Sequence, residues 1–187
     1  SSADDLVLKG SGQTGSNAAI TVAAAGTTTF AEECTLANAT ITTGTFPAGH
    51  ILKVEQNEIS TNPGLVSSST PVVTGLITAI TPTKATSKIL VQMNGGAFDF
   101  GSATNGEVFM YCSINGGAYA LVDKSSRSNI SSPTWSLPHS YSKLHAPSFT
   151  QGQVIRYQPY YAAQSGTFTF NNGYSIPVKL TLFEVAQ

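Results

Sequence analysis

Three histidines are the first residues of this sequence that could do acid–base or metal chemistry. His139 and His145 are close in sequence, flanked by Pro138 and Pro147. A zinc site built on this pair would need a third ligand, and the neighbouring sequence supplies none. We therefore interpret both as exposed loop histidines that hydrogen-bond to water or to the backbone. The sequence predicts no metal site and no cofactor.

Carboxylate pairs are the second candidate for chemistry, because a glycosidase needs two carboxyl groups about 5–10 Å apart. Asp99 and Asp123, or Glu55 and Glu184, could approach across strands. Any β-protein offers such pairs, and solvated positions on strand faces and in turns explain them. The sequence also has no Gly-x-Ser-x-Gly elbow, phosphate loop, dinucleotide fingerprint or His-Glu-x-x-His motif. We predict no catalytic residues and a protein that is not an enzyme.

Aromatic residues gather in the last third of the chain, and they could bind sugars. Rings stack on the apolar faces of pyranoses while nearby amides hydrogen-bond to the hydroxyl groups. The candidate glycan-contacting residues are Trp135, Tyr141, Tyr160 and Tyr161. The alternative is a sandwich core plus a seam between subunits, where Tyr and Trp are also enriched. We favour core and seam, because alternation along a strand points some of these rings inward.

The elements that would position these residues are short β-strands. Charged residues make up only 10% of the chain, against roughly 25% in an ordinary soluble domain. No window has a sustained 3.6-residue apolar period, so no long helix is expected. Asn115-Gly116 between apolar runs predicts a hairpin. The predicted strands cover 51–55, 72–73, 76–80, 88–93, 106–114, 118–123, 134–137, 140–144, 154–161, 167–170 and 178–185. We predict an all-β, antiparallel, jelly-roll-like β-sandwich with an extended N-terminal arm.

The predicted arm, residues 1–46, differs in composition from the sandwich, residues 47–187. It is rich in Ala, Thr, Gly, Ser and Asn and holds few large aliphatic residues. Ordering a residue costs roughly 1–2 kcal/mol, and small side chains do not offset that cost in isolation. We therefore expect residues 1–46 to gain order by packing against other chains.

The net charge and the cysteine content limit the binding partners and the cellular setting that the sequence favours. A net charge of −1 and a pI near 6.2 give no electrostatic footprint for nucleic acid. No run of roughly 18 apolar residues predicts a membrane span. Cys34 and Cys112 form no disulfide framework, which fits assembly in a reducing cytoplasm. Low charge also suits surfaces that neighbouring subunits cover, so we expect a homo-oligomer.

Four motifs between residue 49 and the C-terminus carry a family resemblance. They are Gly49-His50-Ile51-Leu52-Lys53-Val54, Thr74-Gly75-Leu76-Ile77-Thr78-Ala79-Ile80-Thr81-Pro82, Ala85-Thr86-Ser87-Lys88-Ile89-Leu90-Val91 and Leu180-Thr181-Leu182-Phe183-Glu184-Val185-Ala186. In order and spacing this block resembles the C-terminal β-sandwich domain of structural and fibre proteins of tailed bacteriophages, particularly aquatic, cyanophage-like ones. The resemblance implies a trimer-forming sandwich without a known activity, and it transfers no site residues. It does not cover the arm.

The leading hypothesis is a virion structural protein: a trimeric fibre, spike or capsid-decorating subunit assembled in the host cytoplasm. Residues 1–46 would anchor it to other virion proteins, and the outward sandwich would contact host surface glycans. A stand-alone carbohydrate-binding module is the alternative, and it would be monomeric and need no arm. A glycan-degrading spike is the third, and it requires a carboxylate pair in a cleft.

Overall fold

The computed structural model describes residues 48–130, 135–171 and 176–187, with the backbone alone at 100–104, 125–130 and 135–138. The predicted arm and the boundary after residue 46 lie outside the described residues. Nine strands are present in this part of the chain: β1 (Ile51–Ile59), β2 (Leu65–Val66), β3 (Val72–Val73), β4 (Thr78–Ile80), β5 (Lys88–Ile114), β6 (Ala120–Ile130), β7 (Trp135–His145), β8 (Ile155–Thr169) and β9 (Val178–Val185). Every pairing is antiparallel. No described residue is helical, so the predicted all-β sandwich is confirmed.

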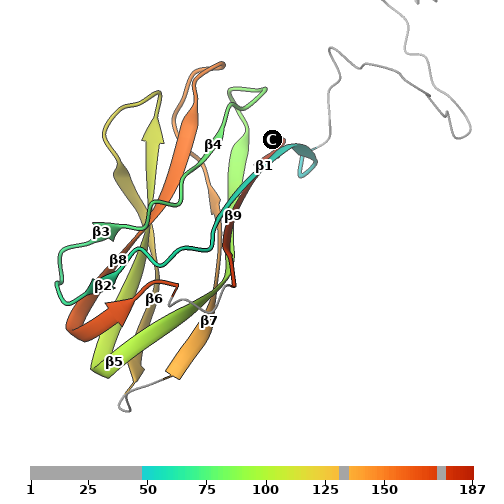
Figure 1. The fold of residues 1–187 in the computed structure, drawn as a ribbon. Helices are drawn as coiled ribbons and strands as arrows, with labels where there is room; N and C mark the ends of the chain where they lie inside the picture. Colours follow the sequence, from blue (N-terminus) through green and yellow to red (C-terminus); the bar gives the residue numbers. More distant parts are fainter. Residues whose placement is uncertain (1–47, 131–134, 172–175) are drawn as a thin grey trace, which may run out of the picture. The chain divides into compact units, whose positions relative to one another are not determined.

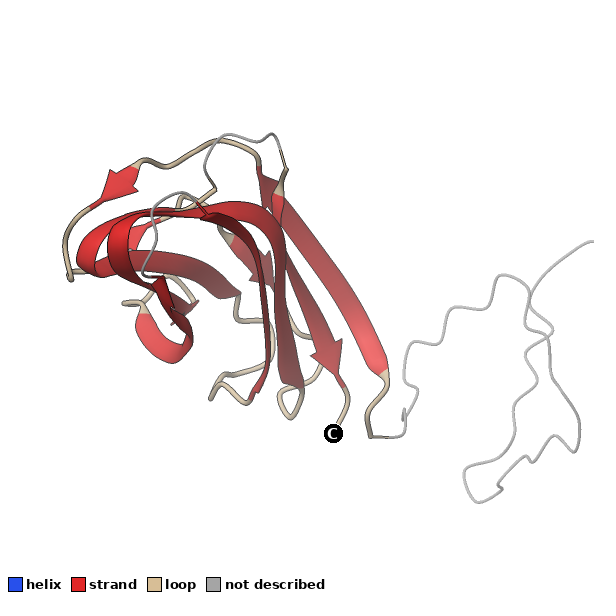
Figure 2. Cartoon of the chain, turned by 90° about the horizontal axis from the view of Figure 1, so that it is seen from below, coloured by secondary structure: helices blue, strands red, loops and turns tan. Residues whose placement is uncertain are grey.

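One long strand, β5, belongs to both layers of the sandwich. Its first part pairs with β9 and β7, and its last part pairs with β6 and β8. We call the layer β1-β9-β5-β7 the first sheet. The second sheet is β6-β5-β8, with β2, β3 and β4 along the far side of β8. Figure 1 shows β5 running the length of the domain, and Figure 2 shows how strongly the strands curve.

The register within β5 shifts at the sequence Asn94-Gly95-Gly96, where a turn or a bulge was expected. The register against β7 shifts between Gly95 and Phe98, so the feature is a bulge. Gly95 and Gly96 have φ angles of +93° and +76°, which side chains disfavour. The bulge bends the strand without ending it. This is why the predicted strands 88–93 and 106–114 are one continuous element.

The hairpin predicted at Asn115-Gly116 is confirmed. Both residues have positive φ, 51° and 77°, and the Gly117 amide donates to the Ile114 carbonyl at 2.9 Å. It joins β5 to β6, with Tyr111 opposite Leu121. The hairpin therefore fixes which residues of the two strands share a face.

Alternate residues of each strand fill the space between the sheets. The first sheet contributes Ile89, Val91 and Met93 from β5 and Val178, Leu180 and Leu182 from β9. The second contributes Val108, Met110, Tyr157, Tyr161 and Phe168. The rings of Phe98 and Phe170 meet edge to face, with centroids 4.8 Å apart. This core is continuous and holds both sheets as one body.

Candidate functional site

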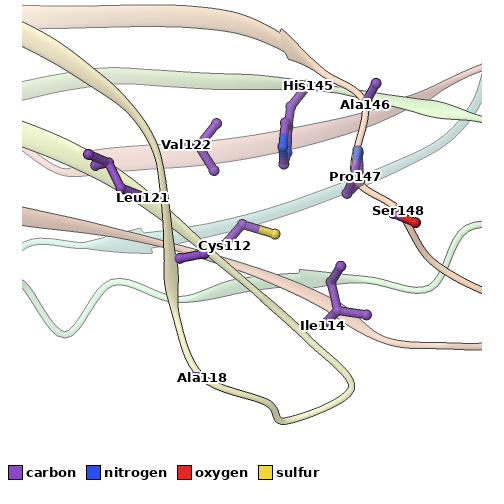
Figure 3. A pocket seen from close by; sticks show the side chains of 10 residues that line it. Cys112, Ile114, Ala118, Leu121, Val122, His145, Ala146, Pro147 and Ser148 are labelled. Carbon is purple, nitrogen blue, oxygen red and sulfur yellow. The ribbon is translucent and has the colours of Figure 1, made fainter.

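A cavity of about 350 Å³ opens between the β5–β6 hairpin and the chain that follows β7 (Figure 3). It is lined by Cys112, Ile114, Ala118, Ala120, Leu121, Val122, His145, Ala146, Pro147 and Ser148. Most of these side chains are apolar, and the polar ones are a thiol, an imidazole and a hydroxyl. The volume is at the lower end of that of small-molecule sites.

Two of the polar lining residues are joined by a buried tyrosine. The Tyr157 hydroxyl lies 2.8 Å from His145 Nδ1, and it also hydrogen-bonds with the Cys112 thiol. Strand pairing explains the contact, because Cys112 of β5 is directly opposite Tyr157 of β8. When the thiol is protonated, it donates to the Tyr157 oxygen and the Tyr157 hydroxyl donates to His145 Nδ1.

The pKa values of this group oppose nucleophilic chemistry. Burial raises the pKa of Cys112 to about 11, although the hydrogen bond from Tyr157 acts in the opposite direction. Burial also lowers the pKa of His145, and the nearby Lys143 charge adds to this. Burial raises the pKa of Tyr157 well above its ordinary value. At neutral pH all three groups are uncharged, so the cavity offers an apolar surface and no thiolate.

The two carboxylate pairs considered from the sequence lie in different surroundings in the structure. Asp123 is opposite Met110 on β5, and about 36 Å of strand separates Met110 from Asp99. Asp123 instead forms an ion pair with Lys143 at 3.2 Å. Glu55 forms an ion pair with Lys53 at 3.1 Å and is exposed, whereas Glu184 is fully buried.

The described ranges contain no group of three or more His, Cys, Asp and Glu residues that could hold a metal ion. His139 and His145 lie on β7 opposite Gly95 and Ile89 of β5. The His139 ring packs against Phe98, with ring centroids 4.9 Å apart and the planes tilted by 56°. The expectation of exposed loop histidines is corrected here: both lie in a strand and are partly buried. Over the same residues, no helix is long and apolar enough to cross a membrane.

The four aromatic residues proposed for glycan contact do not form one surface. Tyr141 and Tyr161 are buried, at 7% and 2% exposure, so their rings belong to the core. Tyr160 points to the outside of the second sheet and is half-buried. Trp135 begins β7 opposite Phe100, and its side chain lies outside the described residues. Strand alternation separates Tyr160 from Tyr161, the outcome that the core interpretation expected for part of this set.

A different tyrosine cluster lies on the outer face of the second sheet. Tyr160 of β8 contacts Tyr111 of β5, with ring centroids 4.4 Å apart and the planes tilted by 46°. Tyr119, just before β6, lies with its ring centroid 6.2 Å from that of Tyr160. All three side chains are half-buried. We call this group the tyrosine cluster. The hairpin at Asn115-Gly116 could have placed Tyr111 near Tyr119, but the pairing of β5 with β8 has no local sequence signal.

Two cations lie on the face that carries the tyrosine cluster. Lys124 forms an ion pair with Glu107 at 3.5 Å, and its Nζ lies 5.1 Å from the centre of the Phe109 ring. Arg156 precedes Tyr160 on the same face of β8 and is close enough to act electrostatically on the Tyr119 hydroxyl. Its guanidinium forms no ion pair with any described residue.

A row of apolar residues crosses the outer face of the first sheet. Val54 of β1 is opposite Phe183 of β9, Phe183 is opposite Leu90 of β5, and Leu90 is opposite Leu144 of β7. Val54 and Leu144 are 50% and 48% exposed. We call these four residues the apolar row. The side chains of the apolar row point away from the core, because their positions alternate along each strand with the positions that fill the core.

The comparisons with known proteins give a likeness in structure alone. No family model matches the chain, and no curated protein matches it. One similar solved structure is that of Eiger TNF from S. frugiperda, at 10% identity and a TM-score of 0.39, over 74% of this chain and 95% of that chain.

Proposed function

We propose that this chain is a non-enzymatic structural subunit that works as a homo-oligomer, a trimer, whose copies meet through the outer face of the first sheet. The observation that carries the proposal is the apolar row. Four aligned apolar side chains on an outward sheet face, two of them about half exposed, are a feature of protein–protein contact surfaces.

The residues beside the apolar row support a contact between identical copies. The next row is neutral and polar: Gln56, Thr181, Gln92 and Ser142. In the row after it, Glu58 and Lys179 neutralise each other at 3.8 Å. Charge depletion is typical of interface cores. On this side of the apolar row the charges cancel, so two copies meet there without like-charge repulsion.

The size of the face is sufficient for a contact. β9 has 8 residues, which is about 26 Å of strand. Four neighbouring strands span about 19 Å, so the face measures about 500 Å². In a three-fold arrangement the same face of each copy would point toward the axis, and the three faces would together bury about 1,500 Å².

We further propose that the oligomer is part of a tailed-phage particle, as a fibre, spike or capsid-decorating subunit assembled in the host cytoplasm. The sequence resemblance and the low charge support this role. Residues 1–46 are proposed to attach the subunit to other virion proteins, and the second sheet to face outward toward host surface glycans. The uncharged cavity at Cys112 supports a role without catalysis.

Analytical ultracentrifugation of the full chain tests the oligomer. We expect a trimer at micromolar concentration, and we expect Leu144→Glu and Val54→Glu to dissociate it while far-UV circular dichroism stays unchanged. Leu65→Glu is the matched control, because Leu65 is 65% exposed on β2, away from the first sheet. A monomeric wild-type chain that still binds glycans would reject the proposal in favour of a stand-alone carbohydrate-binding module.

The attachment role has its own test. A variant that lacks residues 1–45 should retain the circular-dichroism spectrum of the sandwich but be missing from purified particles, as measured by mass spectrometry. Normal incorporation of this variant would reject residues 1–46 as the anchor.

A further inference from the structure

The tyrosine cluster has the geometry of a stacking surface. Tyr111, Tyr119 and Tyr160 come from three neighbouring segments of the second sheet, with centroid separations of 4.4 and 6.2 Å along the cluster. The ring planes are tilted by 46° and 59° to one another, so the cluster presents ring edges as well as ring faces. The rings are half-buried, so the sheet fixes them while part of each ring faces solvent. Little side-chain entropy is then lost when a ligand stacks on them.

Arg156 gives this surface a positive charge that no acidic side chain in the described part of the chain neutralises. The neighbouring cation, Lys124, is already engaged by Glu107 and by the Phe109 ring. Arg156 has no ion-pair partner among the described residues, and its charge acts on Tyr119. A guanidinium presents a planar fork of donors that matches a carboxylate in two parallel hydrogen bonds.

We propose that the tyrosine cluster and Arg156 together bind an acidic saccharide, with a pyranose ring on the tyrosines and the sugar carboxylate on Arg156. This inference rests on the proposed function, since it names the ligand class of the outward surface. The apolar faces of the rings bind the C–H face of the sugar. Gln158, between Arg156 and Tyr160 on the same face of β8, lies opposite Tyr111 and is only 5% exposed, so the ligand contacts are assigned to the tyrosines and Arg156 alone.

The hydroxyls of Tyr119 and Tyr160 are neutral donors at neutral pH. Burial raises the pKa of Tyr119 and of Tyr160 above the ordinary value. A phenolate next to a sugar carboxylate would repel it, and this arrangement avoids that charge. The hydroxyls can therefore hydrogen-bond to the sugar without opposing its carboxylate.

The experiment uses the full chain and four hexasaccharide probes, measured by isothermal titration calorimetry at low salt. Three probes are acidic, made of galacturonate, mannuronate and guluronate, and the fourth is neutral maltohexaose. We expect at least one acidic hexamer to bind and maltohexaose to bind at least about tenfold more weakly, because it lacks the charge-assisted hydrogen bonds. Added salt should weaken the acidic hexamer selectively.

Variants separate the two parts of the site. Arg156→Gln should reduce affinity for the acidic hexamer by about tenfold or more. Tyr160→Leu should reduce it as well by removing the stacking ring. Lys53→Gln removes a cation on β1 that pairs with Glu55, away from the tyrosine cluster and the apolar row, and should leave saccharide binding unchanged. Circular dichroism and a thermal melt confirm that each variant is folded.

Three outcomes would overturn the inference: no acidic hexamer binds at ten millimolar, maltohexaose binds equally well, or Arg156→Gln binds as the wild type does. Sedimentation of the same samples reports separately on the oligomer. A trimer that binds none of the probes leaves the proposed structural role intact and rejects the saccharide site alone.

Discussion

The Ser87 hydroxyl donates a 2.7 Å hydrogen bond to Glu184 Oε1, which ties the start of β5 to the end of β9. The Thr83 hydroxyl and the amides of Thr83 and Lys84 donate to the same oxygen at 2.9, 2.8 and 3.1 Å. Glu184 is fully buried, and its Oε2 has no hydrogen-bond partner in the described part of the chain. The 83–87 loop is therefore organised around one carboxylate oxygen.

Replacing Glu184 should destabilise the sandwich strongly. Glu184→Ala leaves four donors around an empty site, and we expect a loss of about 3 kcal/mol or more in the free energy of unfolding. Glu184→Gln keeps an acceptor oxygen and should cost less. Urea unfolding measures both. Glu55→Ala is the control: Glu55 forms an exposed ion pair, and its loss should cost less than about 1 kcal/mol. Equal losses for Glu184→Ala and Glu55→Ala would contradict this account.

The bulge in β5 should tolerate no side chain at Gly95. A Cβ atom there would overlap the Pro177 carbonyl oxygen, and the φ of +93° is strained for any other residue. We expect Gly95→Ala to cost about 3 kcal/mol or more in thermal or urea unfolding. Gly152 has a similar φ of +88° but open space around it, so Gly152→Ala should cost about 1 kcal/mol. If the two variants are equally stable, the close approach to Pro177 is not what requires glycine.

Local patterns predicted the elements of this fold, whereas contacts between distant strands could not be predicted. Asn115-Gly116 gave the hairpin, because both residues must adopt positive φ. The tyrosine cluster depends on the register of β5 against β8, and no short-range signal encodes that register. Alternation along β8, which is a local pattern, places Tyr160 and Tyr161 on opposite faces of the sheet.

The position of Glu184 in the last strand is a sequence signal for its burial. Val178, Leu180 and Leu182 alternate on one face of the last strand, and the same alternation places Glu184 on that buried face. From the sequence, Glu184 is explained as a solvated carboxylate, and its burial corrects that interpretation. A charge at the next position of an inward series indicates a buried hydrogen-bonded group, because a buried charge without partners is too costly.

The stability of the sandwich should fall on mild acidification because of its histidines. Burial lowers the pKa of His139 and of His145, so the folded state holds both neutral. The unfolded chain protonates them near about pH 6.5. It therefore binds more protons than the folded chain below that pH, and stability declines from about pH 7 downward until the folded-state pKa values are passed.

Urea unfolding at about pH 7.5 and pH 5.5 measures this decline, in a range above the ordinary titration of carboxylates. The double variant His139→Gln, His145→Gln should be less stable at neutral pH, since His145 loses the contact with Tyr157, but its stability should change less between the two pH values. A wild-type chain that becomes more stable at pH 5.5 would show that the two histidines gain protons on folding instead.

The Cys112 thiol should react slowly, because burial raises its pKa to about 11. At pH 8 about one thousandth of it is thiolate, the form that reacts. We expect alkylation by iodoacetamide, followed by mass spectrometry in a Cys34→Ser background, to accelerate about tenfold per pH unit up to about pH 10. Tyr157→Phe removes the hydrogen bond that lowers this pKa, so alkylation of that variant at a given pH should be slower still.

The control for the Cys112 prediction is the same protein in concentrated urea, which gives the alkylation rate of an unprotected thiol. Folded Cys112 that reacts at the unfolded rate at pH 8 would show that the cavity holds a thiolate, and the conclusion that it has no nucleophile would have to be withdrawn.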